Sequence, residues 1–192
     1  GVDLAQRPAE SVPFRYITHC PECGTPLVRE EDEAKHYCPN ATGCPPQIVG
    51  RIVHYISRKA MNIEGLGDET VQLLYNNGLL GDIANLYDLE VEHLVPLERL
   101  GRKSAENIVG NIAGSVEVPY ARVLFAIGIR YVGETTARKL AAAIPSINAL
   151  MTASREELLE VEEVGGKIAD SILAYFADRR NVEMIDRLRR AG

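Results

Sequence analysis

Residues 99–108, "RLGRKSAENI", place a glycine directly before a segment whose apolar side chains have helical spacing. Apolar residues stand four and seven positions after Gly101, so they share one face of a helix that begins there. Arg102 and Lys103 follow the glycine at once. Because a helix start leaves backbone amides unpaired, amides and cations together make a pocket suited to a phosphate. The stretch predicts a phosphate-holding turn.

The same pattern occurs four times along the chain. The copies are "GLGDETVQLL" (65–74), "RLGRKSAENI" (99–108), "YVGETTARKL" (131–140) and "EVGGKIADSI" (163–172), and they align on Gly67, Gly101, Gly133 and Gly165. These glycines are 34, 32 and 32 residues apart. Four positions later come Val71, Ala105, Ala137 and Ala169, and seven positions later come Leu74, Ile108, Leu140 and Ile172. A constant period with a constant inner face predicts one structural unit repeated four times.

Apolar segments also precede each turn, so we expect each unit to be a helix, a tight glycine turn and a second helix. One apolar residue inside each turn is expected to plug the space between the helices: Leu66, Leu100, Val132 and Val164. This is the pattern of a helix-hairpin-helix repeat, and four copies predict one all-α domain over residues 60–192.

The repeated turns are candidates for binding the DNA backbone, because glycine permits close approach and the next helix offers its first amides. The candidate DNA-binding residues are Gly65, Gly67, Arg99, Gly101, Arg102, Lys103, Ser104, Gly133, Thr135, Thr136, Gly165, Gly166 and Lys167. The alternative is that the turns are simply tight connections between antiparallel helices. We expect the second and third turns to bind best, because Glu163 in the fourth should repel phosphate.

All four cysteines lie between residues 20 and 44, at Cys20, Cys23, Cys38 and Cys44. Two close pairs separated by fourteen residues are typical of a four-thiolate zinc ribbon. Four thiolates fill a tetrahedral site, so the zinc is expected to be structural rather than catalytic. A disulfide framework is the alternative, and His19 and His36 are interpreted as bystanders. After the ribbon, prolines at 45–46 and isoleucines spaced by four predict a helix.

The chain has 192 residues, a formal net charge of -6 and a sequence pI of about 5.3. Its charges are uneven: residues 97–139 hold seven basic and four acidic side chains, a local excess of +3. The acidic total therefore does not exclude a local DNA contact. Composition and the lack of a long apolar run predict a soluble intracellular protein, and the first twenty residues read as part of a longer chain.

The order of features resembles a known family. "THCPECG" with two later cysteines, "RKAMNIEGLGDETVQLL", "LERLGRKSAENI" and "LFAIGIRYVGETTARKLA" closely resemble the C-terminal part of bacterial NAD-dependent DNA ligases. In that family an adenylation domain and an OB-fold precede the zinc finger and the four hairpins, and a BRCT domain follows. "RPAESVPF" looks like the exit from the OB-fold.

The resemblance implies an enzyme that seals nicks: NAD adenylates a lysine, AMP passes to the 5′-phosphate, and the 3′-hydroxyl attacks. That lysine lies in a K-x-D-G motif, which is absent from these 192 residues. No catalytic or NAD-binding residue is therefore assigned here, and NAD and Mg²⁺ are expected only in the parent enzyme. The implied partners are duplex DNA, especially nicked DNA, and the other domains of the ligase. A monomer in the bacterial cytoplasm, associated with the nucleoid and not with membranes, is expected.

The prediction is a mainly α chain: a tail at 1–16, a four-cysteine zinc finger with its following helix at 17–59, and a tandem helix-hairpin-helix domain at 60–192. Three alternatives remain open. The chain could belong to a DNA repair or recombination scaffold without a ligase parent, to a base-excision glycosylase, or to a protein-interaction module with no role on DNA.

Overall fold

The computed structural model describes residues 4–8, 10–12, 14–29 and 33–192. It divides into two compact units, Gly1–Pro46 and Gln47–Gly192. Two residues of the segment that resembles the OB-fold exit, Ala9 and Pro13, lie outside the described part. No helix within the described ranges is long and apolar enough to cross a membrane.

The described residues of the first unit have little regular structure. It contains a 3-10 helix, η1 (Leu4–Gln6), and two isolated antiparallel bridges, His19 with Pro26 and Val28 with Tyr37. Among its described side chains, those of Cys20 and Cys44 are the buried ones. Since so little apolar surface is covered, this unit depends on its cysteines for cohesion.

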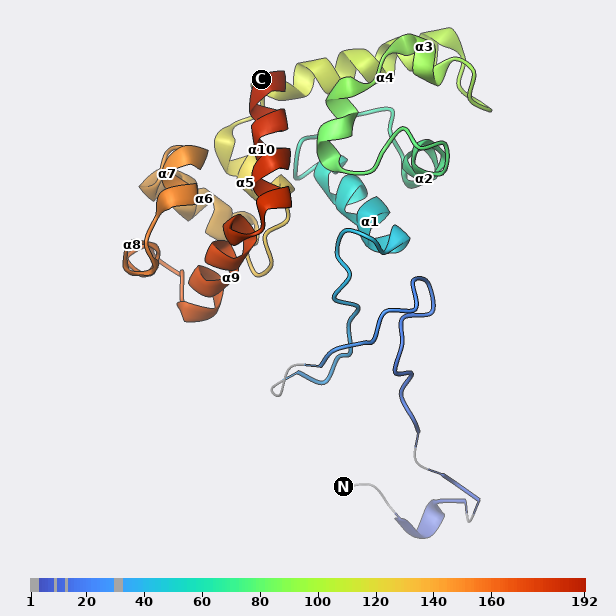
Figure 1. Ribbon diagram of the computed structural model, residues 1–192, viewed down its shortest axis with the longest axis vertical. Helices are drawn as coiled ribbons and strands as arrows, with labels where there is room; N and C mark the ends of the chain where they lie inside the picture. The colour runs from blue at the N-terminus through green and yellow to red at the C-terminus, as the bar shows by residue number, and fades with distance from the viewer. Residues whose placement is uncertain (1–3, 9, 13, 30–32) are drawn as a thin grey trace. The chain divides into compact units, whose positions relative to one another are not determined.

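The second unit is helical, and its helices surround one apolar core (Figure 1). Along the chain they are α1 (Pro45–Ile56), α2 (Asp68–Asn76), η2 (Ile83–Asp88), α3 (Val91–Leu94), α4 (Arg102–Gly114), η3 (Ser115–Glu117), α5 (Tyr120–Ala126), α6 (Glu134–Ala143), α7 (Ile147–Thr152), α8 (Arg155–Leu159), α9 (Gly166–Ala177) and α10 (Arg179–Ala191). The mainly α fold predicted from the repeat is confirmed.

The predicted inner face of each repeat lies in the core. Side chains four positions after the aligned glycine are fully covered in all four copies: Val71, Ala105, Ala137 and Ala169. Those seven positions after it are also buried: Leu74, Ile108, Leu140 and Ile172. Of the four plug residues, Leu66, Val132 and Val164 are buried and Leu100 is half-buried. α2, α4, α6 and α9 therefore begin directly after the aligned glycines, as the spacing predicts.

The helix expected directly before the first turn is not present. α3, α5 and α8 precede the other three turns, whereas α1 ends at Ile56 and residues 57–67 form turns. The amides of Ala60 and Asn62 both donate to the carbonyl oxygen of Ser57, at 3.0 Å each, and Asn62 has a left-handed φ of 53°. These bonds fold the chain back, so Met61 and Ile63 reach the core without a helix.

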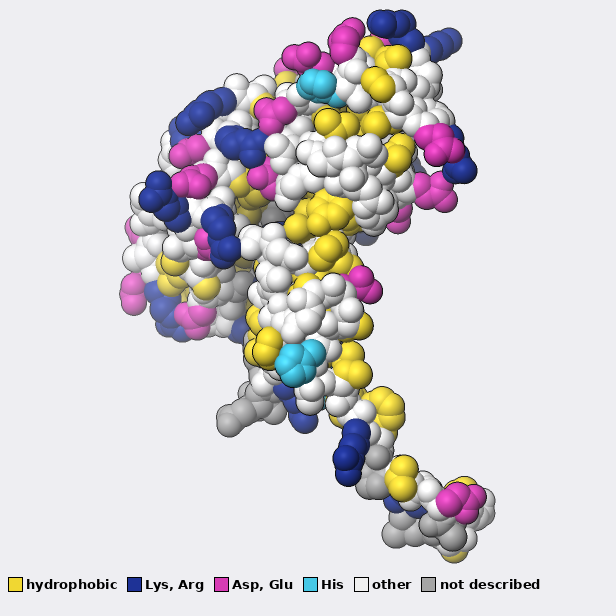
Figure 2. All heavy atoms as spheres, turned by 45° about the vertical axis from the view of Figure 1, so that its right-hand side comes forward, with side chains coloured by type: hydrophobic (Ala, Val, Ile, Leu, Met, Phe, Trp, Pro, Cys, Tyr) yellow, Lys and Arg dark blue, Asp and Glu magenta, His cyan; other side chains and the backbone are white. Residues whose placement is uncertain are grey.

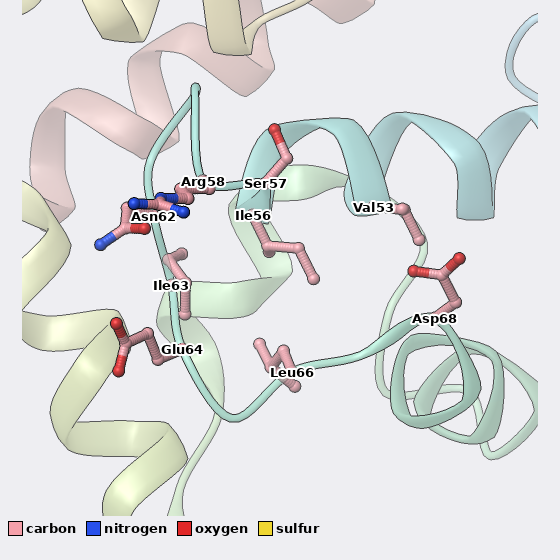
Figure 3. Close-up of a pocket in the computed structure, with 9 residues that line it drawn as sticks. All are labelled: Val53, Ile56, Ser57, Arg58, Asn62, Ile63, Glu64, Leu66 and Asp68. Carbon is pink, nitrogen blue, oxygen red and sulfur yellow. The ribbon is translucent and has the colours of Figure 1, made fainter.

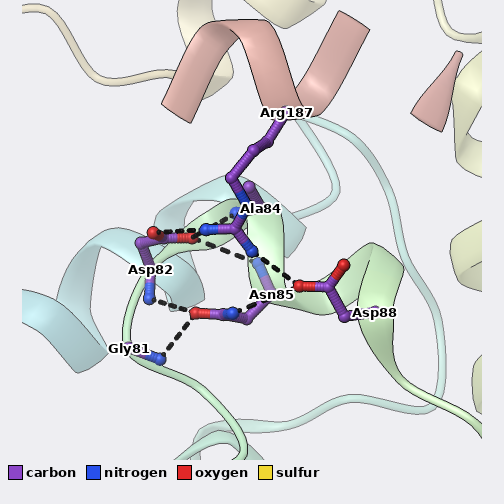
Figure 4. A network of polar contacts seen from close by, with 6 residues as sticks. All are labelled: Gly81, Asp82, Ala84, Asn85, Asp88 and Arg187. Atoms are coloured by element: carbon purple, nitrogen blue, oxygen red, sulfur yellow. Dashed lines mark hydrogen bonds and ion pairs between the residues drawn. The ribbon is translucent and has the colours of Figure 1, made fainter. Parts of the chain in front are cut away.

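The last helix closes the second unit onto its middle. α10 packs on α9 and on η2, and its Arg187 contacts two carboxylates of η2 and its cap (Figure 4). Arg187 Nη1 lies 2.9 Å from Asp82 Oδ2, and Nη2 lies 2.6 Å from Asp88 Oδ2. Asp82 also caps η2 by accepting from the amides of Ala84 and Asn85. Residues about one hundred positions apart are thus joined by one side chain.

Candidate metal centre and nucleic-acid interface

The four cysteines of the first unit form one cluster. Their Sγ atoms all lie within 4.8 Å of one another, with Cys20 and Cys44 3.9 Å apart and Cys23 and Cys38 3.5 Å apart. A tetrahedral ion with Zn–S bonds of about 2.3 Å places its sulfurs about 3.8 Å apart. The cluster therefore has the size that a Zn²⁺ ion requires.

Each close pair is shaped by a backbone turn. In the first, the amide of Gly24 donates to the carbonyl of Cys20 at 2.9 Å, and Gly24 adopts a φ of 70° that favours glycine. In the second, Asn40 supports the longer spacing: its side-chain oxygen accepts from the amide of Gly43, and its carbonyl accepts from the amide of Cys44. Five residues of spacing are therefore compatible with the same cluster.

The surroundings act differently on two of the thiols: they favour the metal-binding thiolate of Cys23, whereas burial raises the pKa of Cys38. The Thr25 hydroxyl lies 3.2 Å from Cys23 Sγ, and donation by the side chain and the backbone amide of Thr25 lowers the pKa of that thiol to about 6. His19 and His36 lie outside the cluster of ligand atoms: the His19 ring contacts the Thr18 hydroxyl, and His36 stacks on Tyr16. Four thiolates leave no open coordination position, so the chemistry of the site is structural.

The four repeated turns of the second unit share one backbone geometry. Turns 1 to 4 are residues 65–67, 99–101, 131–133 and 163–165. The last residue of each is the N-cap of the next helix and has extended φ and ψ, from -98° and 172° at Gly67 to -82° and 162° at Gly101. Any amino acid can adopt this conformation. Glycine is therefore not required there by the backbone.

Packing does not require glycine at these caps either. A Cβ added to Gly67, Gly101, Gly133 or Gly165 would have no heavy atom of the described residues within 4 Å, apart from its own chain neighbours. All four caps are exposed. Each turn thus presents the open first amides of a helix beside a position with no side chain, and the positive end of the helix dipole faces solvent there.

Four other helices of the same unit begin differently, whereas α5 and η3 also lack a side-chain cap. Asp82, Ser146, Ser154 and Asp178 cap η2, α7, α8 and α10, and each side chain accepts from an amide of its helix. Such caps typically stabilise a helix by about 1 kcal/mol. The four hairpin helices lack this interaction, so their first amides are left for another acceptor.

The first residue of every turn has a left-handed backbone. Gly65 has a φ of 83°, and Arg99, Tyr131 and Glu163 have values of 66°, 68° and 68°. A Cβ on Gly65 would lie 3.3 Å from Ile108 Cγ1. The sequence places three side chains where the first copy has glycine, but it gives no sign that the backbone geometry is kept.

Charges distinguish the helix starts from one another. The first turn of α2 carries Asp68 and Glu69, and Asp68 and Glu64 also line a hollow of about 590 Å³ beside turn 1 (Figure 3). α4 begins with Arg102 and Lys103, and Arg102 lies 3.9 Å from Glu92. On the face drawn in Figure 2, basic and acidic side chains are interspersed rather than gathered into a single patch.

The third and fourth helix starts have further charge contacts. Glu134 in the first turn of α6 lies 3.6 Å from Lys59 Nζ and 4.0 Å from Arg138 Nη2. Glu163 in turn 4 lies 2.9 Å from Lys139 Nζ, and Glu162 lies 2.7 Å from it. Hydrogen bonds to these two carboxylates raise the pKa of Lys139 above its ordinary value, and the bond to Glu162 has the larger effect. Sequence reasoning missed Lys139, because its partners are more than twenty positions away.

Side chains of the helices that follow turns 2 and 4 hold the backbone just before turns 1 and 3. Asn111 of α4 donates from Nδ2 to the carbonyl of Glu64 at 3.0 Å, and Ser171 of α9 donates from Oγ to the carbonyl of Arg130 at 2.7 Å. Turns 1 and 2 therefore form a first pair with α2 and α4, and turns 3 and 4 form a second pair with α6 and α9. Of the predicted residues, Lys167 is brought to a neighbouring turn, where it meets Tyr131.

Comparison with known families agrees with this division. Residues 19–45 match the NAD-dependent DNA ligase C4 zinc finger domain. Residues 57–110 match the SAM-like helix-hairpin-helix tandem, and residues 122–185 match the helix-hairpin-helix motif. The first match contains the cysteine cluster, and the other two contain the first and second pairs of turns.

Curated proteins similar to the chain are DNA ligases. Over all 192 residues, the chain is 56% identical to a DNA ligase of Flavobacterium psychrophilum and 46% identical to one of Porphyromonas gingivalis. A DNA ligase of Cytophaga hutchinsonii is 51% identical over 191 residues. The chain spans 29%, 29% and 28% of these three proteins, respectively. It is the region of an NAD-dependent DNA ligase that carries the C4 zinc finger and the helix-hairpin-helix motifs.

Proposed function

We propose that this chain is the non-catalytic, DNA-binding part of a bacterial NAD-dependent DNA ligase. Its turns bind backbone phosphates across the minor groove of duplex DNA, so that the rest of the protein can seal a nick between a 3′-hydroxyl and a 5′-phosphate. The adenylation lysine, NAD and Mg²⁺ belong to other parts of that protein, because no K-x-D-G motif occurs here.

The observation that carries this proposal is the contrast between the four hairpin helices and the helices of the same unit that have side-chain caps. Four helices begin at exposed glycines that neither backbone nor packing requires, while α7, α8 and α10 begin at capping side chains. A phosphate oxygen is the acceptor that suits open amides at the positive end of a helix. Such contacts carry no sequence information, so the proposed binding is independent of base sequence.

A substitution at one glycine cap tests the proposal directly. In Gly101→Asp, the new carboxylate accepts from the first amides of α4 and occupies the place proposed for a phosphate. We expect the Tm to stay the same or rise, because Asp is a better cap than Gly. We expect affinity for a fluorescent nicked duplex, measured by anisotropy at low salt, to fall by about tenfold or more.

The matched control is Ser146→Gly, which removes a side-chain cap from α7 outside the four turns. It should lower stability by roughly a few tenths of a kcal/mol without weakening DNA binding. If Gly101→Asp binds DNA as well as the unchanged chain, the turn does not hold a phosphate.

Salt dependence and a double variant separate DNA binding from the protein-interaction alternative. The logarithm of the affinity should fall linearly with the logarithm of the salt concentration, with a slope of about -0.9 for each phosphate bound. Arg102→Ala with Lys103→Ala should weaken binding and reduce this slope. Unchanged binding and slope in that variant would favour a protein partner instead.

A further inference from the structure

Tyr131 is the first residue of turn 3, and its ring contacts two cations. Arg130 Cζ lies 4.9 Å from the ring centroid, and Lys167 Nζ lies 4.6 Å from it. Lys167 belongs to the first turn of α9, so the ring connects turn 3 with the helix start that follows turn 4. Both distances are within the range of cation–π attraction.

The backbone at Tyr131 is unfavourable for an aromatic side chain. Its φ of 68° lies in the left-handed region, where bulky L residues are uncommon, and the matching residue of turn 1 is Gly65. The ring is also not a core side chain, since Tyr131 is 37% exposed. Neither backbone preference nor hydrophobic burial accounts for a tyrosine here. The two cation contacts are what the ring provides.

The backbone on both sides of Tyr131 is held by hydrogen bonds. Ser171 of α9 donates to the carbonyl of Arg130, and Val132 on the other side of Tyr131 is buried and donates to the carbonyl of Ile129 at 3.0 Å. Both neighbours of the tyrosine are therefore anchored. Glu163, the acidic side chain of turn 4, accepts a hydrogen bond from Lys139 at 2.9 Å.

We propose that Tyr131 is a positioning residue: its ring holds the Lys167 ammonium, with the Arg130 guanidinium beside it, at the boundary between turns 3 and 4, where both cations face one DNA backbone segment. This inference rests on the proposed DNA binding. A lysine that is already held in place loses less side-chain entropy on binding a phosphate, so it binds more tightly. The first pair has no equivalent, because the position that matches Tyr131 is Gly65, which offers no ring to Lys103, the residue that matches Lys167.

A double-mutant cycle on nicked duplex DNA tests the coupling. Tyr131→Gly should lower the affinity about threefold to tenfold, as expected for a lost cation–π contact. Its Tm should remain the same or rise, because glycine suits the left-handed backbone. Tyr131→Phe keeps the ring and should bind like the unchanged chain. In a Lys167→Met background, Tyr131→Gly should have little further effect on affinity.

Lys103→Met is the matched control, because Lys103 occupies the same position in the first pair. Combined with Tyr131→Gly, it should give an additive loss of affinity. The proposal is overturned if Tyr131→Gly leaves the affinity unchanged, or if its effect is equally large with Lys167 and without it. Failure of the proposed function is a separate result: the unchanged chain would then not bind DNA at low salt.

Discussion

The two pairs of turns are alike in their backbones and different in their charges. In each pair, a side chain of the second helix donates to the carbonyl of the residue before the first turn: Asn111 to Glu64, and Ser171 to Arg130. All four turns begin with a left-handed residue and end with an extended glycine cap. The pairs differ in one side chain, which the first helix of each pair places beside the second turn of that pair.

That side chain is Leu73 in the first pair and Lys139 in the second, each six positions after its aligned glycine. Leu73 lines a hollow with Arg99 of turn 2 and with Glu98 just before it, whereas Lys139 bonds to the matching residues, Glu163 and Glu162. The left-handed position is thus basic in turn 2 and acidic but paired in turn 4. Under the proposed DNA binding, the repeated backbone determines where phosphates approach, and the side chains that differ between the pairs determine the charge at each approach.

The largest effect is expected where the backbone geometry itself is broken. In Gly65→Val, the new Cβ takes a left-handed φ and meets Ile108 Cγ1 at 3.3 Å. We expect the free energy of unfolding, measured by urea denaturation, to fall by about 2–3 kcal/mol. The reverse change in the first pair is Arg99→Gly, which removes a side chain from the same conformation and should be neutral or stabilise by up to about 1 kcal/mol. Equal losses from both would show that the left-handed turns do not determine stability.

The sequence predicts the repeat because its physical causes are local. Helical spacing and the glycine before it determine which side chains enter the core, so Val71 and Ala137 could be placed without a structure. The missing helix before turn 1 could not be predicted, because the buried Met61 and Ile63 satisfy an apolar pattern equally well in turns. The bond between Lys139 and Glu163 depends on how α6 packs beside turn 4, and no local pattern contains that information.

The second largest effect concerns the negative charges of Glu162 and Glu163, which Lys139 partly neutralises in the second pair. Lys139→Leu gives α6 the residue that α2 has, and it leaves Glu162 and Glu163 without the cation at 2.7 and 2.9 Å. We expect the uncompensated carboxylates to repel DNA and to lower its affinity about tenfold at low salt, less at high salt. Anisotropy with a nicked duplex measures this.

The control for that change is a double variant, Lys139→Leu with Glu163→Gln, which removes one of the two exposed charges. Affinity should recover partly, because turn 4 then carries less negative charge. If the double variant binds no better than Lys139→Leu alone, Lys139 acts through the packing of α6 rather than through its charge. Its side chain is only 26% exposed, so such packing is available to it.

The third effect concerns the contact between α10 and η2, and it shows how much this contact stabilises the second unit. Arg187→Met keeps the length of the side chain but removes the contacts with Asp82 and Asp88 (Figure 4). These groups are partly exposed, so we expect a loss of about 1 kcal/mol in stability. Arg189→Met removes a contact within α10 alone, with Asp186, and should cost less. Identical urea midpoints for the two variants would contradict a role for Arg187 in joining distant segments.

The smallest effect is a pH dependence confined to the second pair. Arg155 Nε lies 2.7 Å from Asp170 Oδ1, and this hydrogen bond holds the pKa of Asp170 below its ordinary value of 3.8. A carboxyl whose pKa is lower in the folded chain stabilises the fold above its unfolded pKa, and that stabilisation is lost as the pH falls through the folded pKa. The Tm difference between the unchanged chain and Asp170→Asn should therefore be constant above about pH 5 and shrink below about pH 4. In the first pair, the matching Glu106 lies 4.0 Å from Arg102, with both side chains more than half exposed, so Glu106→Gln should lower the Tm less. A difference for Asp170→Asn that grows on acidification would mean that Arg155 does not favour the charged carboxylate.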